Sequence, residues 1–161
     1  MTDEEIQRLL QEVKRPVGRP RRSVGFGERF DVNLTGADTE TAYVLYGRQN
    51  SEVPEDFRVG LRIRRADSAD RLLRTYNGEA HSHNNPLEGE RLPKGFHIHT
   101  ATQRYQARRN RLDGYAEVTD RYNDLRGALS AMLVDCHIAG LTVEELLPPT
   151  QGSLLELMDE D

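Results

Sequence analysis

Four of the five histidines in this 161-residue chain lie within nineteen residues, as two His-x-His pairs. The first pair is His81 and His83, and the second is His97 and His99. Imidazole transfers protons near neutral pH and is a common metal ligand. Because side chains two residues apart on a strand point to the same face, His97 and His99 would present both rings to one side. The spacing therefore predicts a site built from these histidines.

Three kinds of chemistry fit such a cluster, and the residues leave the choice open. Metal-independent cleavage of a phosphodiester needs one imidazole to take the proton of a 2′-hydroxyl and another to protonate the leaving oxygen. A His-x-His pair also supplies two ligands to a transition metal, and a loop histidine could supply a third. In the last case the rings only hold a loop on a sheet through hydrogen bonds. The sequence therefore does not fix whether a cofactor is needed.

Nearby basic and aromatic residues could assist the first chemistry. Arg74 and Arg104 flank the histidines in the chain, and a guanidinium stabilises the negative charge of a phosphorane. Tyr105 could stack on a base or donate a proton. The predicted site therefore consists of four histidines, two arginines and a tyrosine: His81, His83, His97, His99, Arg74, Arg104 and Tyr105.

Five segments are predicted to be strands, the best of them because apolar and polar residues alternate, as in strands packed on one face. The clearest is 57–64, and the others are 28–34, 41–47, 71–76 and 95–102. Turn residues separate the first four segments, so we expect an antiparallel meander of about five strands. Several arginines would line its polar face.

Two segments have helical periodicity. A capping box that begins at Thr2 precedes residues 3–14, which predicts a short amphipathic helix. A longer helix is expected at 123–138, with Asn123 or Asp124 as its N-cap. Together, the elements predict an α+β fold in which a C-terminal helix packs the antiparallel sheet and a short N-terminal helix flanks it.

The remaining segments divide the chain. We expect one domain over residues 1–140 and an acidic tail over 141–161, which holds six acids and no Lys or Arg. Residues 77–95 lack periodicity and are expected to form a long loop that carries the first histidine pair. Residues 14–22 are rich in arginine and proline, and we expect an exposed, solvated linker that could touch phosphates.

Composition and charge indicate where the protein acts and which partners it could bind. The net charge is −5, yet the first 140 residues hold 21 acids against 22 basic residues. No apolar run approaches the length of a membrane span, and no secretory signal is expected. The single cysteine excludes an internal disulfide and favours a reducing cytoplasm. We expect no membrane partner, an RNA or nucleotide partner for the basic face, and a protein partner for the acidic tail, with the oligomeric state open.

Three stretches carry a resemblance to known families. The runs beginning at Arg74 (RTYNGEAHSHNNPLEG), Gly95 (GFHIHTATQRYQ) and Tyr115 (YAEVTDRYNDL) resemble a family of uncharacterised bacterial proteins over roughly residues 1–140. The Tyr-Asn-x-x-x-His run followed by Phe-His-x-His is also loosely similar to TumE-type toxins of toxin–antitoxin pairs. That likeness implies a bacterial setting and a target linked to RNA or translation.

These observations lead to two functional hypotheses. The first is a small cytoplasmic, toxin-like or defence-linked protein that uses the four histidines as a metal-independent ribonuclease or phosphodiesterase. The second is a non-enzymatic binding or regulatory module, such as an antitoxin, an inhibitor or a nucleic-acid-binding protein. The convergence of the imidazoles in space is the feature that would separate them.

Overall fold

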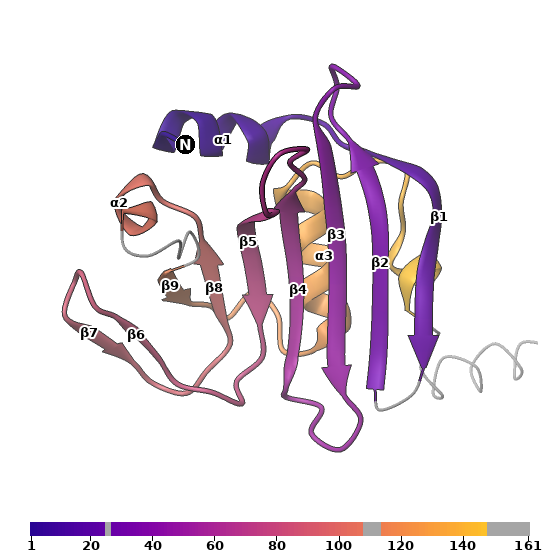
Figure 1. The fold of residues 1–161 in the computed structure, drawn as a ribbon. Coiled ribbons are helices and arrows are strands. Elements are labelled where there is room, and N and C mark those ends of the chain that lie inside the picture. Colours follow the sequence, from indigo (N-terminus) through magenta and orange to yellow (C-terminus); the bar gives the residue numbers. More distant parts are fainter. Residues whose placement is uncertain (25–26, 108–113, 148–161) are drawn as a thin grey trace, which may run out of the picture.

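The structure, a computed structural model, describes residues 1–24, 27–107 and 114–147. Its centre is a seven-stranded antiparallel sheet in the order β1-β2-β3-β4-β5-β8-β9. Figure 1 shows the strands side by side, with a small separate hairpin, β6-β7, beyond the β9 end. The strands span β1 Arg15–Val24, β2 Gly27–Thr35, β3 Ala42–Asn50, β4 Phe57–Ile63, β5 Arg71–Asn77, β6 His83–Asn85, β7 Glu90–Leu92, β8 His97–Thr100 and β9 Tyr115–Val118.

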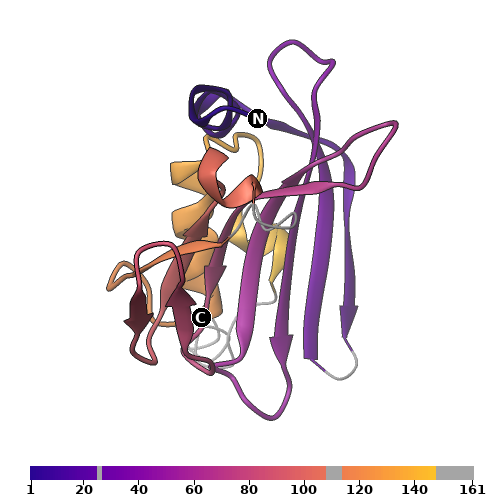
Figure 2. The ribbon, with the colours of Figure 1, turned by 60° about the vertical axis from the view of Figure 1, so that its left-hand side comes forward.

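Four helices accompany the sheet in the described residues: α1 Asp3–Gln11, α2 Gln103–Gln106, α3 Leu125–Asp135 and α4 Val143–Leu146. α3 packs against one face of the sheet, and α1 lies across one end of it (Figures 1 and 2). The apolar residues of alternate strand positions, such as Phe57, Val59 and Leu61, form the core with the buried side of α3. No helix of the described residues covers the opposite face of β2, β3 and β4.

Most of the expected α+β elements are present. The five predicted strands correspond to β2, β3, β4, β5 and β8, and the two predicted helices to α1 and α3. The capping box at Thr2 and the N-cap at Asp124 are both confirmed. The sheet is nevertheless larger than expected, because β1 and β9 extend it at its two edges.

The expectation of a solvated linker at 14–22 is wrong in part: most of its residues are exposed, but the segment is not a linker. This segment pairs with β2 as edge strand β1, in which Pro16 and Pro20 are tolerated because an edge strand need not donate every hydrogen bond. A register shift falls between Val17 and Arg21, where Gly18 takes a φ of 77°. Segment 15–24, which has no apolar alternation of its own, therefore forms a strand by pairing with the edge of β2.

The expectation of a long loop at 77–95 is also wrong in part, because β6 and β7 pair within it. At the other end, α3 stops three residues before the predicted boundary. His137 lies just past the helix with a φ of 54°, and the N–H of Ile138 donates to the carbonyl of Leu133 at 3.0 Å. This closure of the helix end prevents a further turn.

The C-terminal segment is described only as far as residue 147. α4 lies in the stretch that we expected to be an acidic tail, and Leu141, Leu146 and Leu147 are buried in the core. The rest of that stretch, 148–161, lies outside the described residues, and so do four of the six acids to which we assigned a protein partner.

Candidate functional site

Three of the four clustered histidines converge in space. His97 and His99 project from β8, and His83 comes from β6, on the hairpin beside the sheet. The ring centroids lie 4.3 Å apart for His83 and His99, 5.0 Å for His97 and His99, and 6.0 Å for His83 and His97. Residues distant by up to sixteen positions in sequence thus form one imidazole cluster.

The backbone orients two of these rings. Nδ1 of His97 donates to the carbonyl of Gly95 at 2.8 Å, and Nε2 of His83 donates to the carbonyl of Gly114 at 3.1 Å. A carbonyl accepts only, so each bond fixes which nitrogen carries hydrogen. In the neutral rings the lone pair therefore resides on Nε2 of His97 and on Nδ1 of His83.

His97 is held in its neutral form. Burial lowers its pKa below the ordinary value of 6.5, and positive charge on His83 and Arg58 lowers it further, against the raising effect of the bond to Gly95. Only 7% of the residue is exposed. An unprotonated imidazole at neutral pH, with its lone pair on a known nitrogen, is suited to accept a proton.

The cluster forms one wall of a pocket with a volume of about 260 Å³. Arg48, Arg58 and Asp56 also line this pocket. Nε of Arg58 donates to Oδ1 of Asn77 at 2.9 Å, and Nδ2 of Asn77 donates to Oγ1 of Thr75 at 2.9 Å. A buried amide thus holds a guanidinium at the edge of the imidazole cluster.

His81 occupies a different position from the other three. It lines the same pocket, but its side chain is 78% exposed. Its Nε2 lies 4.0 Å from Oδ1 of Asp56. His81 is therefore a residue of the rim, where solvent weakens its interaction with Asp56.

The hairpin that carries His83 is fixed to the edge of the sheet by one asparagine. Nδ2 of Asn85 donates to the carbonyl of Ala116 at 2.8 Å, and Oδ1 accepts from the N–H of Ala116 at 2.9 Å. Asn85 is fully buried. Its amide imitates a strand partner for β9, and this pairing sets the distance from His83 to the rings of β8.

Close backbone packing shapes the floor of the pocket. A Cβ on Gly78 would lie 1.8 Å from the carbonyl oxygen of Glu55, so only glycine fits there. The hydroxyl of Tyr122 lies 2.9 Å from the carbonyl of Asn77 and 3.0 Å from that of His97. Tyr122 therefore ties β5 to β8 directly beneath the site.

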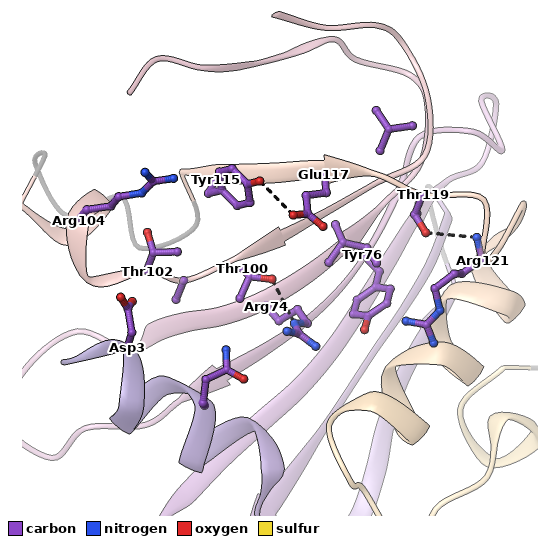
Figure 3. Close-up of a pocket in the computed structure, with 14 residues that line it drawn as sticks. Asp3, Arg74, Tyr76, Thr100, Thr102, Arg104, Tyr115, Glu117, Thr119 and Arg121 are labelled. Carbon is purple, nitrogen blue, oxygen red and sulfur yellow. Dashed lines mark hydrogen bonds between the residues drawn. The ribbon is translucent and has the colours of Figure 1, made fainter. Parts of the chain in front are cut away.

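The structure does not bring Arg74 or Arg104 to the histidines. In the β5-β8 pairing, Arg74 lies opposite Thr100 and Thr75 lies opposite His99, so Arg74 and His99 point to opposite faces. Arg74 and Arg104 instead line a second pocket of about 520 Å³ (Figure 3). Nε of Arg74 donates to Oγ1 of Thr100 at 3.3 Å.

Arg104 and Tyr105 are engaged elsewhere. Arg104 forms an ion pair with Glu88 and lies over the ring of Tyr115, 5.6 Å from its centroid. Tyr105 is buried, and its hydroxyl donates to Glu88. Both residues thus contact the β6-β7 hairpin through Glu88, and neither lines the pocket of the histidines.

Sequence reasoning did not place Arg48, Arg58 and Asn77 in the site. Closeness along the chain suggested Arg74 and Arg104. The correct signal was which positions of neighbouring strands face the same side of the sheet. Arg58 occupies a polar position of the clearest alternating segment, and Asn77 lies directly opposite both Arg58 and His97. Such a signal becomes useful only when the register of the neighbouring strands is known.

A metal centre receives no support from the described part of the chain. Within it, no three His, Cys, Asp or Glu side chains are arranged to hold a metal ion.

No helix of the described residues is long and apolar enough to cross a membrane. Cys136 is fully buried in the core, where burial raises the pKa of its thiol to about 11.

Comparison with known proteins gives a family. No curated protein and no solved structure matches the chain. The expectation of an uncharacterised family is confirmed, whereas a bacterial origin and the likeness to TumE-type toxins stay predictions. A family model covers both histidine pairs, both pockets and every strand, matching residues 1–138, so the chain belongs to a family of unknown function, DUF6978.

Proposed function

We propose that this protein cleaves RNA by metal-independent acid–base chemistry in the pocket of His83, His97 and His99. The observation that carries the proposal is a neutral, oriented imidazole, His97, within 6.0 Å of a second imidazole and beside Arg58. Two imidazoles and one guanidinium can supply the base, the acid and the cation that transesterification of a ribonucleotide uses.

The reaction assigns a role to each group. His97 takes the proton of the 2′-hydroxyl through Nε2 while that oxygen attacks phosphorus. The protonated His83 gives a proton to the departing 5′-oxygen, which leaves a 2′,3′-cyclic phosphate and a free 5′-hydroxyl. Arg58 stabilises the added negative charge on the phosphorane. Both rings can reach oxygens on one phosphorus atom, because each nitrogen–oxygen contact spans about 3 Å.

His99 completes the cluster between these two rings. Its centroid lies closer to each of them than they lie to one another. Only 7% of it is exposed, so its first effect is to fix the positions of His83 and His97. We assign it a positioning role.

A second function keeps the same surface without cleavage. His97 and His99 are both buried, as rings that only support a fold often are. In this alternative the protein binds nucleic acid as a regulator or inhibitor, and the imidazoles shape the pocket. For either function we propose a cytoplasmic setting, in keeping with a single cysteine buried in the core.

Cleavage of end-labelled single-stranded RNA in the presence of EDTA tests the proposal. Wild-type protein should yield a 2′,3′-cyclic phosphate, and a 2′-deoxy residue at the cleaved position should block the reaction. His97→Ala and His83→Ala should each lower kcat by about 100- to 10,000-fold. His137→Ala is the matched control, because His137 is exposed and lies outside both pockets.

The pH profile gives an independent readout. On the acidic side of the profile, kcat/KM should drop with a midpoint below pH 6.5. The reason is that His97 must be neutral to act as the base, and its pKa is lowered from that value. Complete loss of cleavage with EDTA would instead indicate a metal enzyme. RNA that binds but stays intact at stoichiometric protein would favour the regulatory alternative.

A further inference from the structure

Three arginines face one another across neighbouring strands. Arg29 of β2 lies opposite Arg48 of β3, and Arg48 lies opposite Arg58 of β4. The same line continues through Asn77 of β5 to His97 of β8. We call Arg29, Arg48 and Arg58 the arginine row; it crosses the sheet at right angles to the strands and ends at the imidazole cluster.

The charge of the arginine row is compensated only in part. Like charges directly opposite one another destabilise a sheet. Arg48 has a carboxylate partner, Asp56, at 3.3 Å, whereas Arg58 bonds to the neutral amide of Asn77. Arg29 is exposed, and its side chain makes no hydrogen bond or ion pair within the described ranges. A row of like charges that is only partly compensated within the protein is expected where an anion binds.

The surface around the arginine row is open. α1 and α3 lie elsewhere, and no helix of the described chain covers this face (Figures 1 and 2). Beside the row, the ring of Tyr46 lies against Gly60, where a Cβ would approach it to 2.4 Å. The guanidinium of Arg62 lies 5.4 Å from the centroid of Tyr46. A cationic and aromatic sheet face of this kind suits unpaired bases and their phosphates.

We propose that a single strand of RNA lies along the arginine row, across the strands, and delivers one phosphate to the imidazole cluster. Two strand spacings separate Arg29 from Arg58, about 10 Å, which spans roughly three phosphates at 3.4 Å or more per nucleotide. The identity of the cleaved phosphate rests on the proposed function, but the binding path does not. A single strand fits because the bases must splay over a sheet, which a stacked duplex does not allow.

Fluorescence anisotropy with a labelled, 2′-O-methylated single-stranded RNA separates binding from cleavage, because that strand lacks the nucleophile. The test variants are Arg29→Gln and Arg29→Gln/Arg48→Gln. The control, Arg8→Gln/Arg22→Gln, removes equal charge from α1 and from the other face of β1, where Arg22 lies opposite Phe30. Arg29→Gln breaks no internal contact, so it keeps the test valid even if loss of the Arg48–Asp56 pair disturbs folding.

Each lost phosphate contact should lower the slope of log affinity against log salt by about 0.7. We therefore expect a slope reduced by about 0.7 in Arg29→Gln and about 1.4 in the double variant, with affinity about 3-fold and 10-fold weaker. The control should keep the wild-type slope. A duplex of equal length should compete poorly.

The outcomes for the two proposals are distinct. Unchanged slopes in the arginine-row variants, equal competition by a duplex, or binding of an acidic polypeptide in place of RNA would each overturn the inference, even if unmodified RNA is cleaved. Slopes that fall as expected, with unmodified RNA left intact, would uphold the binding path and reject the proposed cleavage.

Discussion

Lys14 links the ends of two helices. Its replacement by methionine tests how much these hydrogen bonds contribute to the free energy of unfolding. The residue is fully buried. Its Nζ donates to the carbonyls of Leu10 at 3.1 Å, Glu12 at 2.9 Å and Cys136 at 2.9 Å. Leu10 lies in the last turn of α1, and Cys136 is the C-cap of α3. One ammonium thus satisfies carbonyls at two negative helix ends.

Lys14→Met removes the donors and leaves the acceptors buried. Each orphaned carbonyl costs about 1 kcal/mol or more, so we expect the free energy of unfolding at pH 7 to fall by roughly 3 kcal/mol. Methionine keeps a similar volume, so cavity formation adds little. The wild-type protein also carries the cost of burying a charged ammonium, which partly opposes this loss. The same burial lowers the pKa of Lys14 from 10.5 to about 8.

The lowered pKa makes the difference depend on pH. Between pH 8 and 10.5 the unfolded chain holds a proton on Lys14 that the folded protein has released, so folding stability rises with pH. From pH 7 to pH 9 the gain is about 1.3 kcal/mol. Lys14→Met lacks this gain, so the gap between the two proteins should widen to roughly 4 kcal/mol at pH 9.

Urea unfolding of both proteins at pH 7 and pH 9, analysed by linear extrapolation, measures these quantities. Lys94→Met is the matched control, since Lys94 is exposed and should tolerate the change at both pH values. The reasoning fails if Lys14→Met is within 1 kcal/mol (about one orphaned carbonyl) of wild type. It also fails if the gap narrows as the pH rises.

Two further substitutions test local features. His137 holds a φ of 54° with an exposed side chain, so His137→Gly should stabilise the protein by about 1 kcal/mol and raise Tm by roughly 2–4 °C in a thermal melt; an unchanged or lower Tm would contradict this. Asn85→Ala removes both bonds to the backbone of Ala116, so it should cost about 2 kcal/mol in urea unfolding and speed amide exchange at Ala116. Protection of that amide equal to wild type would show that the hairpin is held by other contacts.

Local sequence signals determined most of the secondary structure. The alternation of β4, the capping box of α1 and the N-cap of α3 depend on residues a few positions apart, which the sequence displays directly. The clustering of histidines likewise pointed to a site before any fold was known. These features follow from backbone geometry, which repeats every two residues in a strand and every 3.6 in a helix.

Tertiary structure alone decided which of these residues meet. Segment 15–24 has no strand pattern, and it becomes β1 only because β2 offers an unpaired edge. Lys14, expected to be solvated, is buried because two helix ends converge on it. Their partners lie far along the chain, so no local pattern reveals either outcome.

The composition of the site shows the same division. Arg74 is nearer to the histidines in sequence than Arg58, yet it faces away from them, because adjacent residues of a strand point to opposite faces. Arg58 meets His97 through Asn77 by the register of β4, β5 and β8. Strand register is set by the packing of the whole sheet, since a slip of one residue would move every side chain to the other face. The sequence supplied the chemical groups, and the register chose which of them share a pocket.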